Sequence, residues 1–335
     1  MTTIKDVAKS AGVSVATVSR VINKSPKASQ ASIHAVTQAM QALGYRPNAA
    51  ARALVSQSTN TMGVLVSDVS DPFFGTLVKA VDTVARHNGK HLLVGNGYHN
   101  EEDERRSIEL LINNRCDALV IHAKALSDEE LIAFSKEAKS MVVINRHIPG
   151  LEDRCISLDN HKGAFMATEY LIRQGHKKIA CIVSNHAIAD AVERETGYQD
   201  ALEAHHITLP DTYIAYGEPS SEGGEQAMLS LLTKGIDITA IVAYNDNMAA
   251  GALSVMEENG IESPGQISII GFDDGLIARY VKPHLTTVRY PIQMMAETAA
   301  QLALDLSKDD TLNDGSPKRY SPTMVKRDSV KSLND

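Results

Sequence analysis

The first 46 residues place apolar side chains at helical spacing and predict three short helices. Thr3 and Ser14 carry hydroxyls that can cap the first two helices, and Gly12 suits the end of the first. A third helix opens at Ser29 and presents an apolar face that closes a small core. Two short helices joined by a tight turn are the layout of a helix-turn-helix, whose second helix enters the DNA major groove. The segment therefore predicts a DNA-binding headpiece over residues 1–46.

A short helix-prone run follows a break at Pro47. Asn48 can cap the run 49–55, which is too short to be a stable helix alone in water. The polar residues 57–60 have the composition of a linker. We therefore expect a hinge helix and linker over residues 47–60.

From residue 61 onward, apolar strand-like runs alternate with amphipathic helical stretches. The alternation starts with a strand at 62–66 and a helix at 73–86, and it continues to a strand at 267–272. Short apolar strands separated by helices indicate parallel sheets with helices on both faces. The run is too long for one sheet, so we expect an α/β fold with a core of two similar, doubly wound lobes over residues 61–335. Ligands bind beyond the carboxyl ends of such strands, here in a cleft between the lobes.

Polar and aromatic side chains follow several of these strands. A single polar residue in such a place is more often a helix cap or a turn former, and Asp71, Asn245 and Asp246 can each be explained in that way. Taken together, the polar and aromatic side chains at the strand ends favour a sugar site, because carboxylate, amide and guanidinium groups bind hydroxyls and aromatic faces cover a sugar ring. The chain has no Trp, so stacking falls to Phe or Tyr. The candidates at strand ends are Asp68, Asp71, Phe73, Phe74, His122, Asn145, Arg146, Asp159, Asn245, Asp246, Asp273, Asp274 and Tyr290.

Charge is distributed unevenly along the chain. Residues 1–60 contain seven Lys or Arg and one acid, a net of +6, whereas the whole chain carries −8 and the remainder therefore −14. A basic end on an acidic protein favours contact with phosphates through that end. A solvated basic tail is the alternative, but this segment is also capped and apolar at helical spacing.

The sequence contains no sign of secretion, of a membrane span or of catalysis. The three Cys are far apart, the N-terminus lacks the apolar core of a signal peptide, and no run approaches the roughly 20 apolar residues of a membrane helix. No dinucleotide fingerprint, Walker loop or nucleophile elbow occurs, and the 12 His show no metal-ligand spacing. We therefore expect a cytoplasmic protein with no catalytic residue, cofactor, metal or membrane contact. A transport-type sugar receptor would suit the core alone, but the headpiece argues against it.

The chain resembles the lac repressor family over essentially its whole length. The motifs that carry the resemblance are residues 4–8, 13–21, 45–48, 53–54, 174–176, 244–251, 268–274 and 285–288. Within the family, residues 69–75, 95–99 and 145–146 are most similar to the branch that regulates galactose operons. The resemblance implies a homodimeric repressor that binds a pseudo-palindromic double-stranded operator and is released by a sugar, D-galactose. A different sugar or a co-repressor remains an alternative within the family.

The resemblance also implies which residues contact DNA. Val15 and Ala16 take the base-reading positions, where small apolar side chains can touch a thymine methyl but make no bidentate hydrogen bond. Arg20 has the donors to read guanine, and Leu54 matches the residue wedged into the minor groove, although a helix-packing residue is the alternative. The remaining predicted contacts, to phosphates or in the hinge, are Thr17, Ser19, Asn23, Asn48 and Arg52.

The core resembles periplasmic sugar-binding proteins, and the family pattern places the effector contacts. It implies an N-lobe of about 61–160 plus 291–321 and a C-lobe of about 161–290 plus 322–335. Residues 218–220 lack the aromatic that several relatives place there, which leaves one face of the sugar ring without that partner. The chain ends without a leucine heptad tail, so we expect no tetramer-forming helix. The implied effector contacts are Asp71, Phe73, Phe74, His122, Asn145, Arg146, Arg194, Asn245, Asp273 and Tyr290.

Overall fold

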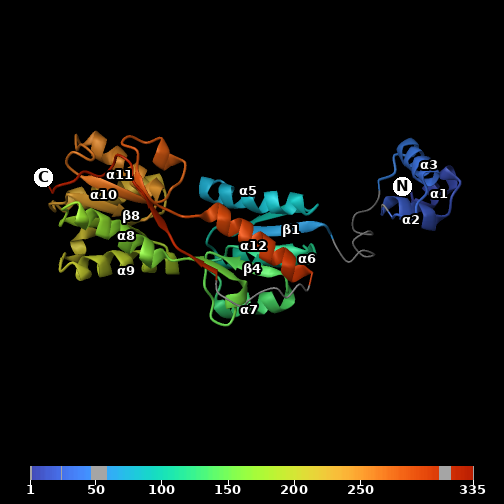
Figure 1. Ribbon diagram of the computed structural model, residues 1–335, viewed down its shortest axis with the longest axis horizontal. Coiled ribbons are helices and arrows are strands. Elements are labelled where there is room, and N and C mark those ends of the chain that lie inside the picture. Colours follow the sequence, from blue (N-terminus) through green and yellow to red (C-terminus); the bar gives the residue numbers. More distant parts are fainter. Residues whose placement is uncertain (1, 24, 47–58, 309–317, 335) are drawn as a thin grey trace. The chain divides into compact units, whose positions relative to one another are not determined.

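The computed structural model describes residues 2–23, 25–46, 59–308 and 318–334, and it divides into two compact units, residues 1–59 and 60–335 (Figure 1). The first unit is the headpiece. Its helices are α1 (Ile4–Ala11), α2 (Val15–Ile22) and α3 (Gln30–Ala42). The predicted hinge helix, with Asn48, Arg52 and Leu54, lies outside the described residues.

Local capping explains where the headpiece helices begin and end. Thr3 and Asp6 form a capping box at α1, with the Thr3 N–H donating to the Asp6 carboxylate at 2.8 Å. Ser14 accepts from the backbone N–H of Thr17 at 3.1 Å, and Gly12 ends α1 in the left-handed conformation at φ 66°. These details confirm the predicted caps. The buried core of the three helices consists of Val7, Ala8, Val18, Val36 and Ala39.

The second unit contains two six-stranded sheets, which we call the sheets of the N-lobe and the C-lobe. The N-lobe sheet is parallel throughout, in the order β11 (Lys318–Tyr320), β5 (Cys155–Leu158), β4 (Met141–Ile144), β3 (Ala118–Ile121), β1 (Thr61–Val66) and β2 (His91–Asn96). Its helices are α5 (Pro72–His87), α6 (Glu101–Asn113), α7 (Asp128–Glu137) and α12 (Ile292–Ser307).

The C-lobe repeats this architecture with one exception. Its sheet has the order β12 (Thr323–Val325), β10 (Thr286–Arg289), β9 (Ser268–Asp273), β8 (Ala240–Ala243), β6 (Ile179–Ser184) and β7 (Ile214–Gly217). Only β12 is antiparallel to its neighbour. The helices are α8 (Asn160–Arg173), α9 (Ala189–Ala204), α10 (Ser221–Thr233) and α11 (Asp246–Glu258), and three short 3-10 segments are Glu152–Arg154, Asp211–Tyr213 and Ile277–Arg279.

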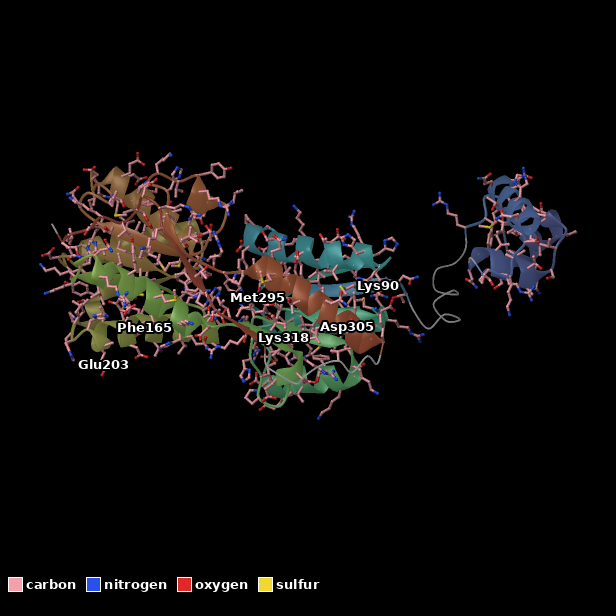
Figure 2. The ribbon with its side chains drawn as sticks, in the orientation of Figure 1. Lys90, Phe165, Glu203, Met295, Asp305 and Lys318 are labelled. Carbon is pink, nitrogen blue, oxygen red and sulfur yellow. The ribbon has the colours of Figure 1, made fainter. Side chains whose placement is uncertain are left out.

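The polypeptide crosses from one lobe to the other three times, after β5, after β10 and after β11. As a result α12 lies against α5 although the two helices come from opposite ends of the core sequence (Figure 1). Met295 near the start of α12 is fully buried, whereas Lys90 precedes β2 and marks the amino end of the N-lobe sheet (Figure 2). The predicted two-lobed α/β fold is confirmed, but the apolar pattern did not indicate β10, α12, β11 or β12.

Each sheet has a switch point at its first strand. β1 lies between β2 and β3, and β6 lies between β7 and β8, so the connections that leave each pair of strands run to opposite faces. Such a divergence leaves a crevice at the carboxyl ends of the strands. None of the described helices is both long enough and apolar enough to cross a membrane.

Candidate functional site

The exposed surface of α2 is the candidate DNA-reading surface. Val15 is 41% exposed, although it is apolar and opens the helix, and Ala16, Arg20 and Asn23 are also exposed. Thr17 and Ser19 are half-buried and bonded within the headpiece: the Thr17 and Ser14 hydroxyls lie 2.9 Å apart, and Asn23 Nδ2 donates to Ser19 Oγ at 3.4 Å. An exposed apolar side chain beside an exposed Arg, at the start of a short helix, suits contact with base edges.

A cavity at the carboxyl ends of both sheets gathers the predicted effector residues, and we call it the cleft cavity. The segments after β1, β3, β6 and β8, the strands on either side of the two switch points, all contribute to its lining. Of the predicted effector residues, those that line it are Asp71, Phe73, Phe74, His122, Asn145, Arg194, Asn245, Asp273 and Tyr290.

Arg146 is the predicted effector residue that the structure places elsewhere. Its guanidinium donates to the carbonyl oxygens of Ala123 and Leu126, at 3.2 and 2.8 Å, and lies 2.6 Å from the carboxylate of Asp128. Arg146 therefore holds the segment after β3 and lines a neighbouring cavity. The expectation that it joins the other effector residues is not met.

Three buried polar atoms in the cleft cavity have no hydrogen-bond partner among the described residues: Asn145 Oδ1, His186 Nδ1 and Tyr290 Oη. Buried polar atoms in native proteins are nearly always bonded, so these three atoms are candidates for contact with a bound molecule. A ligand with several hydroxyls could satisfy all three atoms.

Arg194 is the central cation of the C-lobe side of the cavity. Its guanidinium lies 3.7 Å from the centroid of the Phe272 ring and 4.5 Å from that of Tyr244. Nε donates to Asn160 at 3.0 Å, Nη1 donates to the carbonyl of Tyr244 at 2.6 Å, and Nη2 lies 3.7 Å from Asp273 Oδ1. Burial raises the pKa of Asp273 well above its ordinary value, and Arg194 opposes that shift. The pair presents fixed donors and acceptors to the cavity.

Aromatic rings form the apolar side of the cavity. Phe73 meets Phe74 edge-on at 5.2 Å between centroids and meets Tyr290 at 5.1 Å, while Phe74 meets His122 at 4.9 Å. Such edge-to-face contacts fix the rings and leave an apolar surface for one side of a sugar ring. Pro219 lines the cavity where the family pattern has its further aromatic.

Two predicted residues also act as helix caps. Asp71 accepts from the backbone N–H of Phe73 at 2.8 Å, and Asn245 accepts from that of Met248 at 2.8 Å. Asn245 Nδ2 in turn donates to the carbonyl of Pro219 at 3.0 Å. At both positions, the side chain therefore caps a helix and also lines the cleft cavity.

Several lining residues were not predicted. His99 and His186 follow β2 and β6, so the same strand-end argument would have found them had it been applied to those strands. Lys124 follows β3 at the same separation as His99 follows β2, so the argument would have found it as well. Asp190 lies further beyond β6, and no pattern in the sequence indicates it. The other unpredicted lining residues are Ile188, Pro219, Tyr244 and Asn247.

The segment that carries Lys124 is held by a buried carboxylate. Glu104 of α6 is fully buried and accepts the backbone N–H groups of residues 124–126, each at 3.0 Å. Gly97 leaves room for it, because a Cβ at that position would lie 2.6 Å from Glu104 Cγ. These bonds fix the backbone that positions Lys124 in the cavity.

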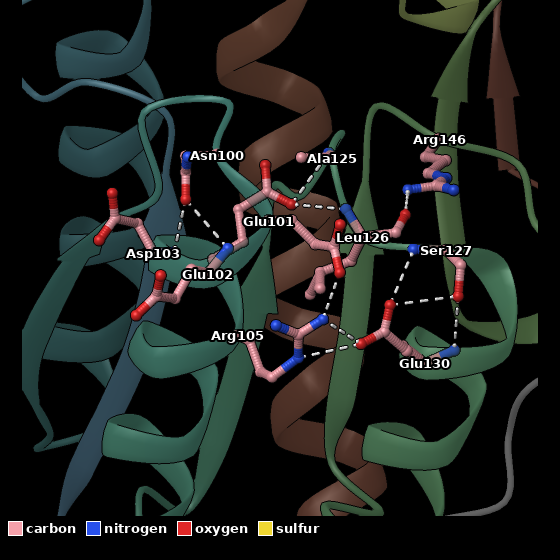
Figure 3. A network of polar contacts seen from close by, with 11 residues as sticks. Asn100, Glu101, Glu102, Asp103, Arg105, Ala125, Leu126, Ser127, Glu130 and Arg146 are labelled. Atoms are coloured by element: carbon pink, nitrogen blue, oxygen red, sulfur yellow. Dashed lines mark hydrogen bonds and ion pairs between the residues drawn. The ribbon is translucent and has the colours of Figure 1, made fainter.

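A second set of contacts fixes the start of α7, which follows the same segment (Figure 3). Ser127 and Glu130 form a capping box, and Arg105 donates to the Glu130 carboxylate through Nε and Nη2 at 3.0 and 2.6 Å. Hydrogen bonds therefore fix the segment after β3 and the start of α7 on the N-lobe side of the cavity.

We expect the stability of the core to fall below pH 6.5 because of His99. Burial, followed by the nearby His186 and Lys124, lowers the pKa of His99 from about 6.5 to about 4. The unfolded chain then binds a proton between about pH 6.5 and pH 4 that the folded chain does not, so acid favours unfolding in that window. Melting temperatures at pH 7.5 and pH 5 should differ less in His99→Asn than in the unchanged protein. His91→Gln, at an exposed position of β2, is the control, and an unchanged difference in His99→Asn would contradict the assignment.

A helix-turn-helix headpiece joined to a two-lobed α/β core with a polar, aromatic-lined cleft defines a ligand-responsive DNA-binding regulator. Residues 3–48 match the lacI family of bacterial regulatory proteins, and residues 168–330 match a periplasmic binding protein-like domain. The HTH-type transcriptional regulator GalR of Escherichia coli (strain K12) is 57% identical over 330 residues, which cover 98% of this chain and 96% of that protein. The chain belongs to the lacI family and is a transcriptional regulator rather than an enzyme.

Two further comparisons support the same family over nearly the whole chain. The HTH-type transcriptional regulator GalS of Salmonella typhimurium (strain LT2) is 51% identical over 330 residues, covering 98% of this chain and 97% of that protein. The crystal structure of the lac repressor dimer bound to operator and the anti-inducer ONPF has a TM-score of 0.86 at 26% identity, and it covers 98% of this chain and 99% of that chain.

Proposed function

We propose that this protein is a cytoplasmic, homodimeric repressor of galactose-utilisation genes that leaves its operator when D-galactose fills the cleft cavity. The single observation that carries the ligand half is the group of unpaired polar atoms on Asn145, His186 and Tyr290, which lies beside a wall of aromatic rings. The full-length similarity to regulators named GalR supports galactose, and the likeness to a dimer bound to operator supports the DNA-binding half.

The proposed residue roles follow from exposure and chemistry. Arg20 reads a guanine, Val15 and Ala16 contact thymine methyl groups, and Thr17, Ser19 and Asn23 hold phosphates. Asn48 and Arg52 of the hinge accompany Leu54, which enters the minor groove. In the core, Arg194 and Asp273 bind hydroxyls of the sugar, while the phenyl rings of residues 73 and 74 cover its apolar side.

Induction requires that galactose prefer the conformation that does not bind the operator. Coupling between two such sites is typically about 1–3 kcal/mol, or roughly 5–150-fold in affinity, and two sites in a dimer add to each other. An equal affinity for both conformations would produce no response.

An operator-binding titration tests the proposal. A duplex is selected from a random pool by the full-length protein, and its binding is then followed by fluorescence anisotropy with and without D-galactose. We expect galactose to weaken binding by about 5-fold or more, and D-glucose, which differs at one hydroxyl, to have little effect. Stronger binding with galactose would show a co-repressor instead, and no response to any monosaccharide would disprove the sugar half.

A further inference from the structure

One ion pair joins the two lobes at the cleft cavity. Lys124 Nζ, which follows β3 of the N-lobe, lies 2.7 Å from Asp190 Oδ1, in the first turn of α9 of the C-lobe. Their side chains are 3% and 9% exposed. Asn145 of the N-lobe bonds both partners: its Nδ2 donates to Asp190 Oδ2 at 2.9 Å, and its carbonyl accepts from Lys124. We call Lys124 and Asp190 the interlobe ion pair.

The cations around Asp190 favour the charged form of its carboxylate. Burial by itself would raise the pKa of Asp190, but Lys124 and Arg194 outweigh it and hold the pKa below its ordinary value. A buried ion pair is costly to separate, because each charge is then left without its partner in a largely buried site.

The interlobe ion pair also separates two cavities. Lys124, Asn145, Ile188 and Asp190 line the cleft cavity, and the same four residues line a second cavity, which we call the back cavity. The cleft cavity is small, at about 90 Å³, whereas the back cavity measures about 580 Å³. The back cavity has a mixed lining whose polar side chains include Ser157, Asn160, Glu193 and Arg319. Space for a larger ligand therefore lies beyond the ion pair on this side of the cleft cavity. A third cavity of about 700 Å³ adjoins the cleft cavity at Asp71, Asp273 and Tyr290, and its lining does not include the ion pair.

We propose that the interlobe ion pair is a specificity determinant. It excludes sugars that carry a substituent at the end of the ring that faces the back cavity, so that the ligand is a free monosaccharide at that end. A substituent at that end could reach the back cavity only by parting Lys124 from Asp190. The unpaired charges left behind would cancel the gain from the added contacts. This inference rests on the proposed sugar-binding function and adds the chemical class of the ligand to it.

The experiment compares the full-length protein with the double variant Lys124→Ala/Asp190→Ala, which removes both charges and so leaves neither buried alone. Calorimetric titrations use D-galactose, methyl α-D-galactopyranoside, methyl β-D-galactopyranoside and 6-O-methyl-D-galactose. We expect the unchanged protein to bind at least one methyl derivative about 10-fold or more weakly than galactose. The double variant should bind that same derivative to within a few-fold of galactose.

The double variant Lys90→Ala/Asp117→Ala is the matched control. Lys90 forms an ion pair of 2.5 Å with Asp117 that is also largely buried, but it lies at the amino end of the N-lobe sheet, away from the cleft (Figure 2). Its removal should leave the ranking of the four sugars unchanged. Thermal melting establishes that each variant is folded. If Lys124→Ala/Asp190→Ala is unstable, Lys124→Gln/Asp190→Asn keeps the hydrogen-bonding groups without charge and should relax the rejection in part.

The outcomes distinguish the two proposals. A protein that binds all four sugars equally, or a folded Lys124/Asp190 double variant that still rejects the same derivative to the same degree, overturns the role of the ion pair. A protein that binds no free hexose contradicts the proposed function, and the specificity proposal then fails with it.

Discussion

Replacing Asp273 by alanine should weaken the response to galactose while leaving operator binding intact. Asp273 ends β9, lines the cleft cavity and lies 3.7 Å from the guanidinium of Arg194. Asp273 is proposed to bind hydroxyls of the sugar, and losing a hydrogen bond so that a buried partner is left unsatisfied costs about 1–3 kcal/mol, which corresponds to a loss of sugar affinity of roughly 5–150-fold. The DNA-binding surface belongs to the other compact unit of the chain, so the operator affinity without sugar should not change.

The measurement is an operator titration over a range of galactose concentrations. Asp273 has a positive φ of 110°, which Asn tolerates better than Ala, so Asp273→Asn separates loss of the carboxylate from backbone strain. Asp237→Ala is the control, because Asp237 pairs with Lys178 on the surface of the same lobe. A normal galactose response in both Asp273 variants would remove this residue from the site.

Replacing Arg20 by alanine should reduce the preference for operator over random DNA by about 1–3 kcal/mol, or roughly 5–150-fold. Arg20 is exposed near the end of α2 and is the residue on this surface whose side chain can make a bidentate contact with guanine. Val15 and Ala16 offer methyl contacts only, so much of the hydrogen-bonded discrimination depends on Arg20.

The matched control is Lys9→Ala, at an exposed cation of α1 in the same headpiece. Loss of a phosphate contact should weaken binding to both duplexes equally and reduce the salt dependence by about one unit. Anisotropy titrations on the selected operator and on a random duplex, at two salt concentrations, separate the two effects. Equal losses on both duplexes for Arg20→Ala would contradict its role in reading bases.

The strained backbone of the cleft supports its assignment as the ligand site. Asn145 and Asp273 both have positive φ, at 61° and 110°, and both line the cleft cavity. Residues other than glycine adopt such angles at a cost of about 1–3 kcal/mol, and they do so where the surrounding structure requires it.

Much of the structure was open to prediction because it depends on neighbours in the sequence. The caps at Thr3 and Ser14 need only the backbone three residues further on, and they were predicted at the correct positions. The strands β3 and β4 are apolar at every position and fully buried, which is why the parallel sheets were predictable. The strand-end argument then identified eight of the 17 residues that line the cleft cavity, and the family resemblance added Arg194.

The sequence by itself therefore determined the headpiece, the two-lobed α/β core and the edge of the sheets at which the candidate ligand site lies. Only the tertiary structure decided where Arg146 points and that Lys124 meets Asp190 across the lobes. It also decided that β12 runs antiparallel to β10. The physical reason is how far apart in the sequence the interacting residues lie. Helix caps and the periodic spacing of apolar residues depend on neighbours within a few positions. A side chain beyond a strand end takes its direction from whichever distant segment offers a partner.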